Sequence, residues 1–228
     1  MFFDAGETLV HPAPSFPELF ARIVTEQGYP REPVAISERL TMVSEEFRRA
    51  SHEQALWTTS PERSRRFWLG VYDRFLDVLG LPRDDGLADT LYRAFTDRRN
   101  YASFDDVLPA LVELRDAGLV LGVISNYEAW LEDLLADLRL TGLLPIRVVS
   151  GVEGVEKPDP AIFLLALERA ALPAPDVVYV GDVPDFDYDP PAALGMFPVL
   201  IDRRERHPDF SGTRVTDLRR LPELLEAS

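Results

Sequence analysis

The hydrophobic positions of this chain follow two different periods, and the change between them divides the sequence. From about residue 16 to residue 99 the apolar residues recur at the spacing of amphipathic helices, with no convincing strand. Four groups of turn-forming residues break this stretch into about four helices: Gly28-Tyr29-Pro30, Ser60-Pro61-Glu62, Gly80-Leu81-Pro82 and Asp84-Asp85-Gly86. Ser60 followed by Pro61 is typical of a helix start, because the hydroxyl caps free N–H groups and proline fits the first turn.

After Tyr101 short apolar runs alternate with helical patterns. The runs predicted to be buried strands are 119–124, 146–149, 177–180 and 197–201. The predicted helices are 105–117, 128–138, 160–170, a short one at 192–193 and a last one at 217–225. Strands that alternate with helices indicate a parallel sheet covered on both faces. We therefore predict an α/β fold with a doubly wound parallel sheet.

The first strand of this sheet lies at the other end of the chain. Residues 1–3 form a short apolar run that leads directly into Asp4. The helical block follows this strand, so we predict a core of residues 1–13 and 101–228 and an inserted helical cap of residues 14–100. Three residues span only about 10 Å, so either this strand is unusually short or the native chain carries a few more N-terminal residues, and we favour the second interpretation.

Composition and charge exclude several classes of function. The chain has 228 residues, a formal net charge of −15 and no cysteine, which removes disulfides, thiolate nucleophiles and cysteine-based zinc sites. The negative charge argues against nucleic acid and anionic membrane surfaces as partners. No apolar run approaches the roughly 20 residues of a membrane span, and we expect a cytoplasmic protein. A site for phosphate in such an acidic chain must bring its own positive field.

Polar residues follow four of the predicted strands, at the edge where ligands bind in parallel sheets. These residues are Asp4, Ser125, Asn126, Lys157, Asp182 and Asp187. Lys157 is the only lysine in the chain. Carboxylate oxygens hold Mg²⁺, a lysine offsets negative charge, and a hydroxyl with backbone N–H groups holds phosphate oxygens. This combination favours a site for a metal-bound phosphoryl group.

The four segments, in this order and followed by Ala192-Ala193-Leu194-Gly195-Met196, resemble the motifs of the haloacid dehalogenase superfamily over essentially the whole chain. The block 14–100 resembles the helical C1-type cap of its subclass I. The resemblance implies a Mg²⁺-dependent hydrolase of a small phosphorylated metabolite: a phosphate ester, an acyl phosphate or an anhydride. In this reading Asp4 is the nucleophile that forms an aspartyl-phosphate.

The same resemblance assigns the other site residues. Lys157 would steady the nucleophile and the transferring charge, while Ser125 and Asn126 would bind the substrate. The implied metal ligands are Asp4, Asp182, Asp187 and the backbone carbonyl of Gly6.

Gly6 is the departure from the pattern of the family. Its phosphatases usually carry a second aspartate two residues after the nucleophile, as a general acid and base. Losing such a group costs about 10²–10⁴-fold in rate. The alternatives are a substrate with a good leaving group, an acid recruited from the cap, a slow enzyme, or a phosphoryl-binding protein without catalysis. Glu7 is a poor substitute, because neighbouring side chains point in different directions.

Two other activities of the superfamily fit less well. Phosphonatases need a cap lysine, and residues 14–100 contain none. Haloacid dehalogenases proper usually carry an aromatic residue where this chain has Gly6, and they need no metal. Dehalogenation therefore stays a lesser alternative. The three histidines, His11, His52 and His207, show no spacing typical of a metal site.

Overall fold

The computed structural model describes residues 1–53, 56–83 and 85–226. The chain forms two compact units. One contains Met1–Val10 and Ser103–Ser228, and the other contains His11–Ala102.

The first unit is built on a six-stranded sheet in which every pair of neighbours is parallel. Its strands, in spatial order, are β5 (Ile146–Val149), β4 (Gly122–Ser125), β1 (Phe2–Phe3), β6 (Val178–Gly181), β7 (Phe197–Ile201) and β8 (Arg214–Val215). The predicted doubly wound α/β fold is confirmed. β8 was missed, because two residues are too few to show a strand pattern.

Strand β1 has only two residues, yet it lies inside the sheet between β4 and β6. Its neighbours extend the pairing, since Gly122 N donates to Met1 O at 3.0 Å and Asp4 N donates to Val180 O at 2.8 Å. The N-terminal ammonium donates to Val120 O at 2.7 Å. A side chain on Gly122 would come within 2.6 Å of the ring of Phe2, so this glycine allows β4 to lie against β1.

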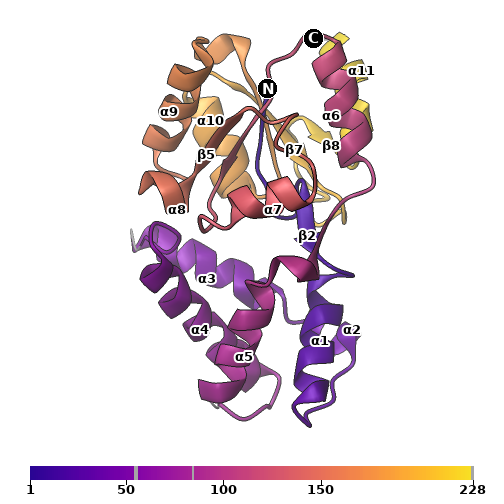
Figure 1. Ribbon diagram of the computed structural model, residues 1–228, viewed down its shortest axis with the longest axis vertical. Helices are drawn as coiled ribbons and strands as arrows, with labels where there is room; N and C mark the ends of the chain where they lie inside the picture. Colours follow the sequence, from indigo (N-terminus) through magenta and orange to yellow (C-terminus); the bar gives the residue numbers. More distant parts are fainter. Residues whose placement is uncertain (54–55, 84, 227–228) are drawn as a thin grey trace. The chain divides into compact units, whose positions relative to one another are not determined.

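Helices cover both faces of the sheet (Figure 1). The helices of this unit are α6 (Val107–Asp116), α7 (Leu131–Asp137), α8 (Ser150–Glu153), α9 (Pro160–Ala170), α10 (Asp189–Ala193) and α11 (Leu221–Glu226). Phe2, Ile124 and Tyr179 pack with α9 in one apolar cluster. Side chains alternate along a strand, so Phe3 faces the other way, toward the side on which Figure 1 shows α6 and α11.

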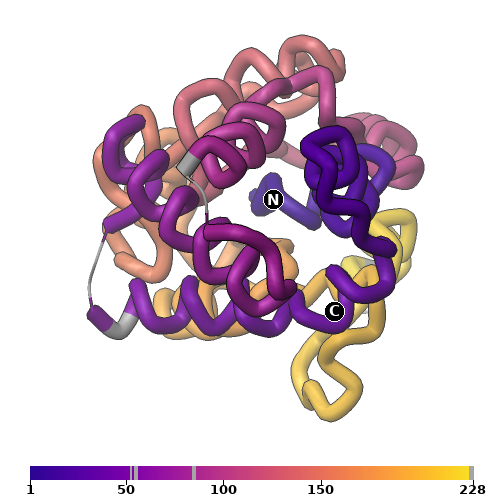
Figure 2. The backbone as a smooth tube through the Cα atoms, turned by 90° about the horizontal axis from the view of Figure 1, so that it is seen from below, coloured from indigo at the N-terminus to yellow at the C-terminus, as the bar shows by residue number. Residues whose placement is uncertain are grey.

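The second unit is helical. Its helices are α1 (Phe16–Glu26), α2 (Pro33–Ser37), α3 (Thr41–His52), α4 (Pro61–Val78) and α5 (Asp85–Phe95), and Figure 2 shows their coils in the indigo-to-magenta part of the colour scale. The predicted start of a helix at Ser60-Pro61 is confirmed, because the Ser60 side chain accepts from Arg63 N at 3.3 Å. The described part of this unit contains five helices, whereas the sequence predicted about four, and the five-residue α2 is the shortest of them.

The helical unit has its own apolar core, in which Phe20, Phe75 and Leu91 are fully buried. The rings of Phe20 and Phe75 meet edge to face at 5.1 Å. Two short strands that the sequence did not reveal, β2 (Val10–Pro12) and β3 (Tyr101–Ser103), pair where the chain enters and leaves this unit. Among the described residues, no helix combines the length and the apolar character that crossing a bilayer requires.

Candidate active site

The order of the strands explains how distant residues meet at one edge of the sheet. Asp4 directly follows β1, Ser125 ends β4, and Asp182 directly follows β6. Because β1 lies between β4 and β6 and all three are parallel, their carboxyl ends share one edge. The structure therefore brings these three residues together as the sequence predicts.

Lys157 enters this edge from the loop between α8 and α9 and is only 3% exposed. Its ammonium donates to Asp4 Oδ1 at 2.7 Å, to Asp187 Oδ1 at 2.6 Å and to the hydroxyl of Tyr179 at 3.1 Å. An ammonium has three N–H groups, so each of them has an acceptor within the protein.

Asn126 holds the backbone of Lys157. Its amide nitrogen donates to Lys157 O at 2.8 Å, and its amide oxygen accepts from Lys157 N at 2.7 Å. An amide side chain can donate and accept at once, which suits it to hold the backbone N–H and C=O of one residue. These contacts show Asn126 positioning the lysine loop, and its predicted contact with substrate stays a prediction.

The two carboxylate oxygens of Asp4 differ in their surroundings. Oδ1 accepts from Ser125 Oγ at 3.0 Å and from Lys157. Within residues 1–53, 56–83 and 85–226, no hydrogen bond reaches Oδ2 of Asp4. One oxygen is therefore held firmly, and the other is available to form a new bond.

Asp187 reaches the cluster from a short π-helical turn, Pro184–Tyr188. Its Oδ1 accepts from Lys157 and, at 3.0 Å, from Tyr179, and its Oδ2 accepts from Val183 N at 3.0 Å. A side chain on Gly181 would come within 2.4 Å of Asp187 Cγ, so only glycine permits this approach. Turns of this kind occur often at functional sites.

Asp4, Asp182 and Asp187 place one carboxylate oxygen each within 4.8 Å of one another. Asp182 is half-buried, and the other two are buried. Oxygen donors at this density fit a hard cation such as Mg²⁺. Both oxygens of Asp187 already accept hydrogen bonds from the protein, so Asp182 and Asp4 are the carboxylates with more freedom to take a metal. The backbone carbonyl of Gly6 as a ligand stays a prediction.

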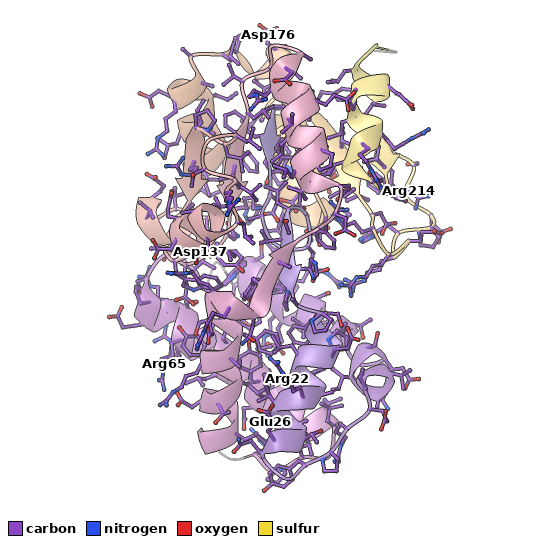
Figure 3. The ribbon with its side chains drawn as sticks, turned by 45° about the vertical axis from the view of Figure 1, so that its right-hand side comes forward. Arg22, Glu26, Arg65, Asp137, Asp176 and Arg214 are labelled. Carbon is purple, nitrogen blue, oxygen red and sulfur yellow. The ribbon has the colours of Figure 1, made fainter. Side chains whose placement is uncertain are left out.

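Most carboxylates of this acidic chain lie in solvent, as Figure 3 shows for Glu26, Asp137 and Asp176. The carboxylates at the site behave differently. Burial raises the pKa of Asp4 to about 6, with the Lys157 charge lowering it and the Asp187 charge raising it. Burial, followed by the charges of Asp187 and Asp4, raises the pKa of Asp182 well above its usual value. A cation bound here would relieve this repulsion.

Lys157 keeps its charge in this environment. Burial alone lowers the pKa of a lysine, but the charges of Asp187 and Asp4 and their hydrogen bonds outweigh burial, so the pKa of Lys157 lies above its usual value. The ammonium is therefore a permanent positive charge beside the Asp4 carboxylate.

No side chain stands at position 6, and the ring of Tyr127 lies next to it. A Cβ added to Gly6 would lie 3.7 Å from Tyr127 Cε2, which is ordinary contact. The next residue, Glu7, has a left-handed backbone with a φ of 55°. Its carboxylate pairs with Arg204 at 3.0 Å, so in this structure Glu7 does not replace the missing aspartate.

Tyr179 is a residue of the site that the sequence motifs did not predict. It lies in β6, which was read simply as an apolar strand, and it is fully buried. The sequence contains one indication of this role, a tyrosine in the middle of the apolar run Val-Val-Tyr-Val-Gly. A buried phenol needs a hydrogen-bond partner, which predicts a polar group beside this strand. Its partners are the charged groups of the site.

Comparisons with known proteins agree with this geometry. A family model described as haloacid dehalogenase-like hydrolase matches residues 1–195. The chain therefore belongs to the haloacid dehalogenase-like hydrolases, as its motifs indicated.

Two relatives and one solved structure show the range of the family. The zebrafish (Danio rerio) haloacid dehalogenase-like hydrolase domain-containing protein 3 is 30% identical over 213 residues, covering 90% of this chain and 85% of its own length. A phosphoserine phosphatase from Thermus thermophilus is 30% identical over 180 residues, covering 73% of this chain and 71% of its own. A magnesium-bound HAD-hydrolase from Bacillus subtilis superposes with a TM-score of 0.77 at 16% identity, covering 98% and 96% of the two chains. At that identity it supports the fold alone.

The raised pKa values lead to a prediction for metal binding. With a pKa of about 6 for Asp4, this carboxylate is mostly protonated at pH 5 and mostly ionised at pH 7. A cation needs the ionised form, so Mg²⁺ should bind at least about tenfold more tightly at pH 7 than at pH 5, since the raised pKa of Asp182 acts in the same direction. Titration calorimetry measures the affinity and the proton released on binding.

Two variants serve as controls for this titration. Asp182→Asn should weaken Mg²⁺ binding strongly, whereas Asp137→Asn, which removes an exposed carboxylate of α7, should leave it unchanged. Equal affinity at the two pH values would contradict the account of the site's electrostatics.

Proposed function

We propose that this chain is a Mg²⁺-dependent hydrolase of a small phosphorylated substrate and that it works through an aspartyl-phosphate on Asp4. The observation that carries the proposal is the asymmetry of the Asp4 carboxylate. Lys157 and Ser125 hold its Oδ1 at 2.7 and 3.0 Å, while its Oδ2 has no hydrogen bond among the described residues. Membership of a hydrolase family supports the same reaction type.

In the proposed reaction Asp4 Oδ2 attacks phosphorus and the bond to the leaving oxygen breaks. Water then cleaves the acyl phosphate, which releases phosphate and regenerates the carboxylate. Lys157 balances the negative charge beside the nucleophile and fixes its direction, which is the main task in phosphoryl transfer. A bound Mg²⁺, held by the carboxylates of Asp4, Asp182 and Asp187 and by the Gly6 carbonyl, would neutralise charge on the phosphoryl oxygens.

The leaving group distinguishes among substrates. Gly6 offers no proton to an alkoxide, so the substrates that suit the site best are acyl phosphates and anhydrides, whose leaving groups need little protonation. The phosphatase name of the Thermus thermophilus relative makes phosphoserine a test substrate as well. The helical unit, in this proposal, acts as the cap that selects among such metabolites.

A second candidate function is phosphoryl binding without catalysis. The observation that favours it is again Gly6, together with the pairing of Glu7 to Arg204, since these leave no evident acid and base at the nucleophile. The two candidates differ in turnover, so one panel of substrates separates them.

The panel should contain acetyl phosphate, p-nitrophenyl phosphate, phosphoserine and 2-chloropropionate, each with and without Mg²⁺. We expect phosphate release from at least one phosphorylated compound, dependence on Mg²⁺, and no chloride release. Asp4→Asn should reduce turnover to background, because an amide is a poor nucleophile, while Asp137→Asn should keep the wild-type rate. Turnover by Asp4→Asn at the wild-type rate would reject the nucleophile, and binding without any turnover would favour the second candidate.

Gly6→Asp tests the account of the leaving group. The backbone at Gly6 is not left-handed and a Cβ meets only Tyr127, at 3.7 Å, so the variant should fold. A general acid contributes about 10²–10⁴-fold where protonation is needed. We therefore expect the rate with alkyl phosphates such as phosphoserine to rise by at least about tenfold, and the rate with acetyl phosphate to change little. Equal effects on both substrates, measured as kcat, would contradict the argument.

A further inference from the structure

The hydroxyl of Tyr179 lies at the centre of the charged cluster, although its residue belongs to the buried sheet. The side chain is fully buried, and its ring packs edge to face on Phe163 at 5.3 Å. The hydroxyl oxygen lies 3.1 Å from Lys157 Nζ and 3.0 Å from Asp187 Oδ1. It also lies 3.0 Å from Ile124 O, the carbonyl that precedes Ser125 in β4.

The number of protons decides which group donates. A phenol has one proton and an oxygen that accepts, whereas the ammonium of Lys157 can only donate. Lys157 therefore donates to the hydroxyl oxygen, and the single phenolic proton goes to Asp187 Oδ1 or to Ile124 O. In either case the hydroxyl links the lysine to a second fixed group.

This link determines the direction of the ammonium. Two N–H groups of Lys157 go to Asp4 and Asp187, and the third has the Tyr179 oxygen as its only acceptor in the described part of the chain. Without that oxygen a buried N–H of a charged group would be unpaired, which is costly. The ammonium would then rotate or draw in water, and its bond to Asp4 would lose its fixed geometry.

We propose that Tyr179 is a positioning residue of the active site, which completes the set of acceptors around Lys157 and thereby fixes the orientation of the Asp4 carboxylate. The inference rests on the proposed function for its effect on catalysis, but the contact with Lys157 can be tested without any activity. A purely structural tyrosine would affect stability and leave both the lysine and the turnover of folded protein unchanged.

The kinetic test is Tyr179→Phe, which keeps the ring and removes the hydroxyl. The variant removes one hydrogen bond to a charged group. The free energy of such a bond corresponds to a fall in kcat of about tenfold to hundredfold. KM should change by less than about twofold, because Tyr179 acts through Lys157 and does not touch the substrate. The matched control is Tyr101→Phe, which also removes a hydroxyl bonded to a backbone carbonyl, Phe95 O at 2.8 Å, and should keep the wild-type kcat.

The second test uses the fact that Lys157 is the only lysine. Protein grown with ¹⁵N-labelled lysine has a single side-chain ammonium, so one NMR signal reports its protons. In the wild type and in Tyr101→Phe we expect slow exchange of these protons with water. In Tyr179→Phe we expect exchange to be at least about tenfold faster, or the signal to be lost, because one N–H has lost its acceptor.

The outcomes separate this inference from the proposed function. If the wild type turns over no substrate, the proposed function fails, and the ammonium signal still decides whether Tyr179 positions Lys157. Unchanged exchange in a folded Tyr179→Phe protein would overturn the inference, as would an unchanged kcat in an active one. If this variant fails to fold, 3-fluorotyrosine at position 179 weakens the acceptor while keeping the hydroxyl. It should then accelerate exchange by a smaller factor, and unchanged exchange would again overturn the inference.

Discussion

The active site depends on one buried charge, the ammonium of Lys157, which lies between two carboxylates. Removing such charges from water is expensive, and their attraction compensates only when the geometry is good and every donor and acceptor is used. The structure meets this condition for Lys157, whose three N–H groups reach Asp4, Asp187 and Tyr179. The cluster is therefore sensitive to the loss of any partner, because each loss leaves a buried charge incompletely paired.

Three features of the backbone allow this cluster to form. The parallel order β4-β1-β6 brings the ends of three strands to one edge. Asn126 fixes the backbone N–H and C=O of Lys157 through two hydrogen bonds, and Gly181 leaves room for Asp187. In the proposed function, Mg²⁺ and Lys157 would both place positive charge where this acidic protein binds a phosphoryl group. Asp187 contacts the lysine, and it also places a carboxylate oxygen within 4.8 Å of oxygens of Asp4 and Asp182, so the metal site predicted from all three carboxylates stays a prediction.

The sequence predicted the sheet and the identity of the clustered residues, because motifs at the ends of apolar strands follow from local pattern and topology. It did not predict the role of Asn126 or the contacts of Tyr179, since both depend on the path of a loop and on packing between strands. The π-helical turn at Asp187 and the two-residue β8 were also missed, because neither has a periodic pattern. The departure at Gly6 was visible in the sequence, whereas the ring of Tyr127 beside it was visible only in the structure.

The central claim is that Asp4 forms a covalent phosphoryl intermediate. The most direct measurement is to mix the protein with Mg²⁺ and acetyl phosphate, quench it rapidly, reduce it with borohydride and analyse the N-terminal peptide by mass spectrometry. Borohydride converts an aspartyl-phosphate to homoserine, so the account predicts homoserine at position 4 in the wild type and none at this position in Asp4→Asn. Active protein that carries no modified residue, or one modified at another carboxylate, would contradict it.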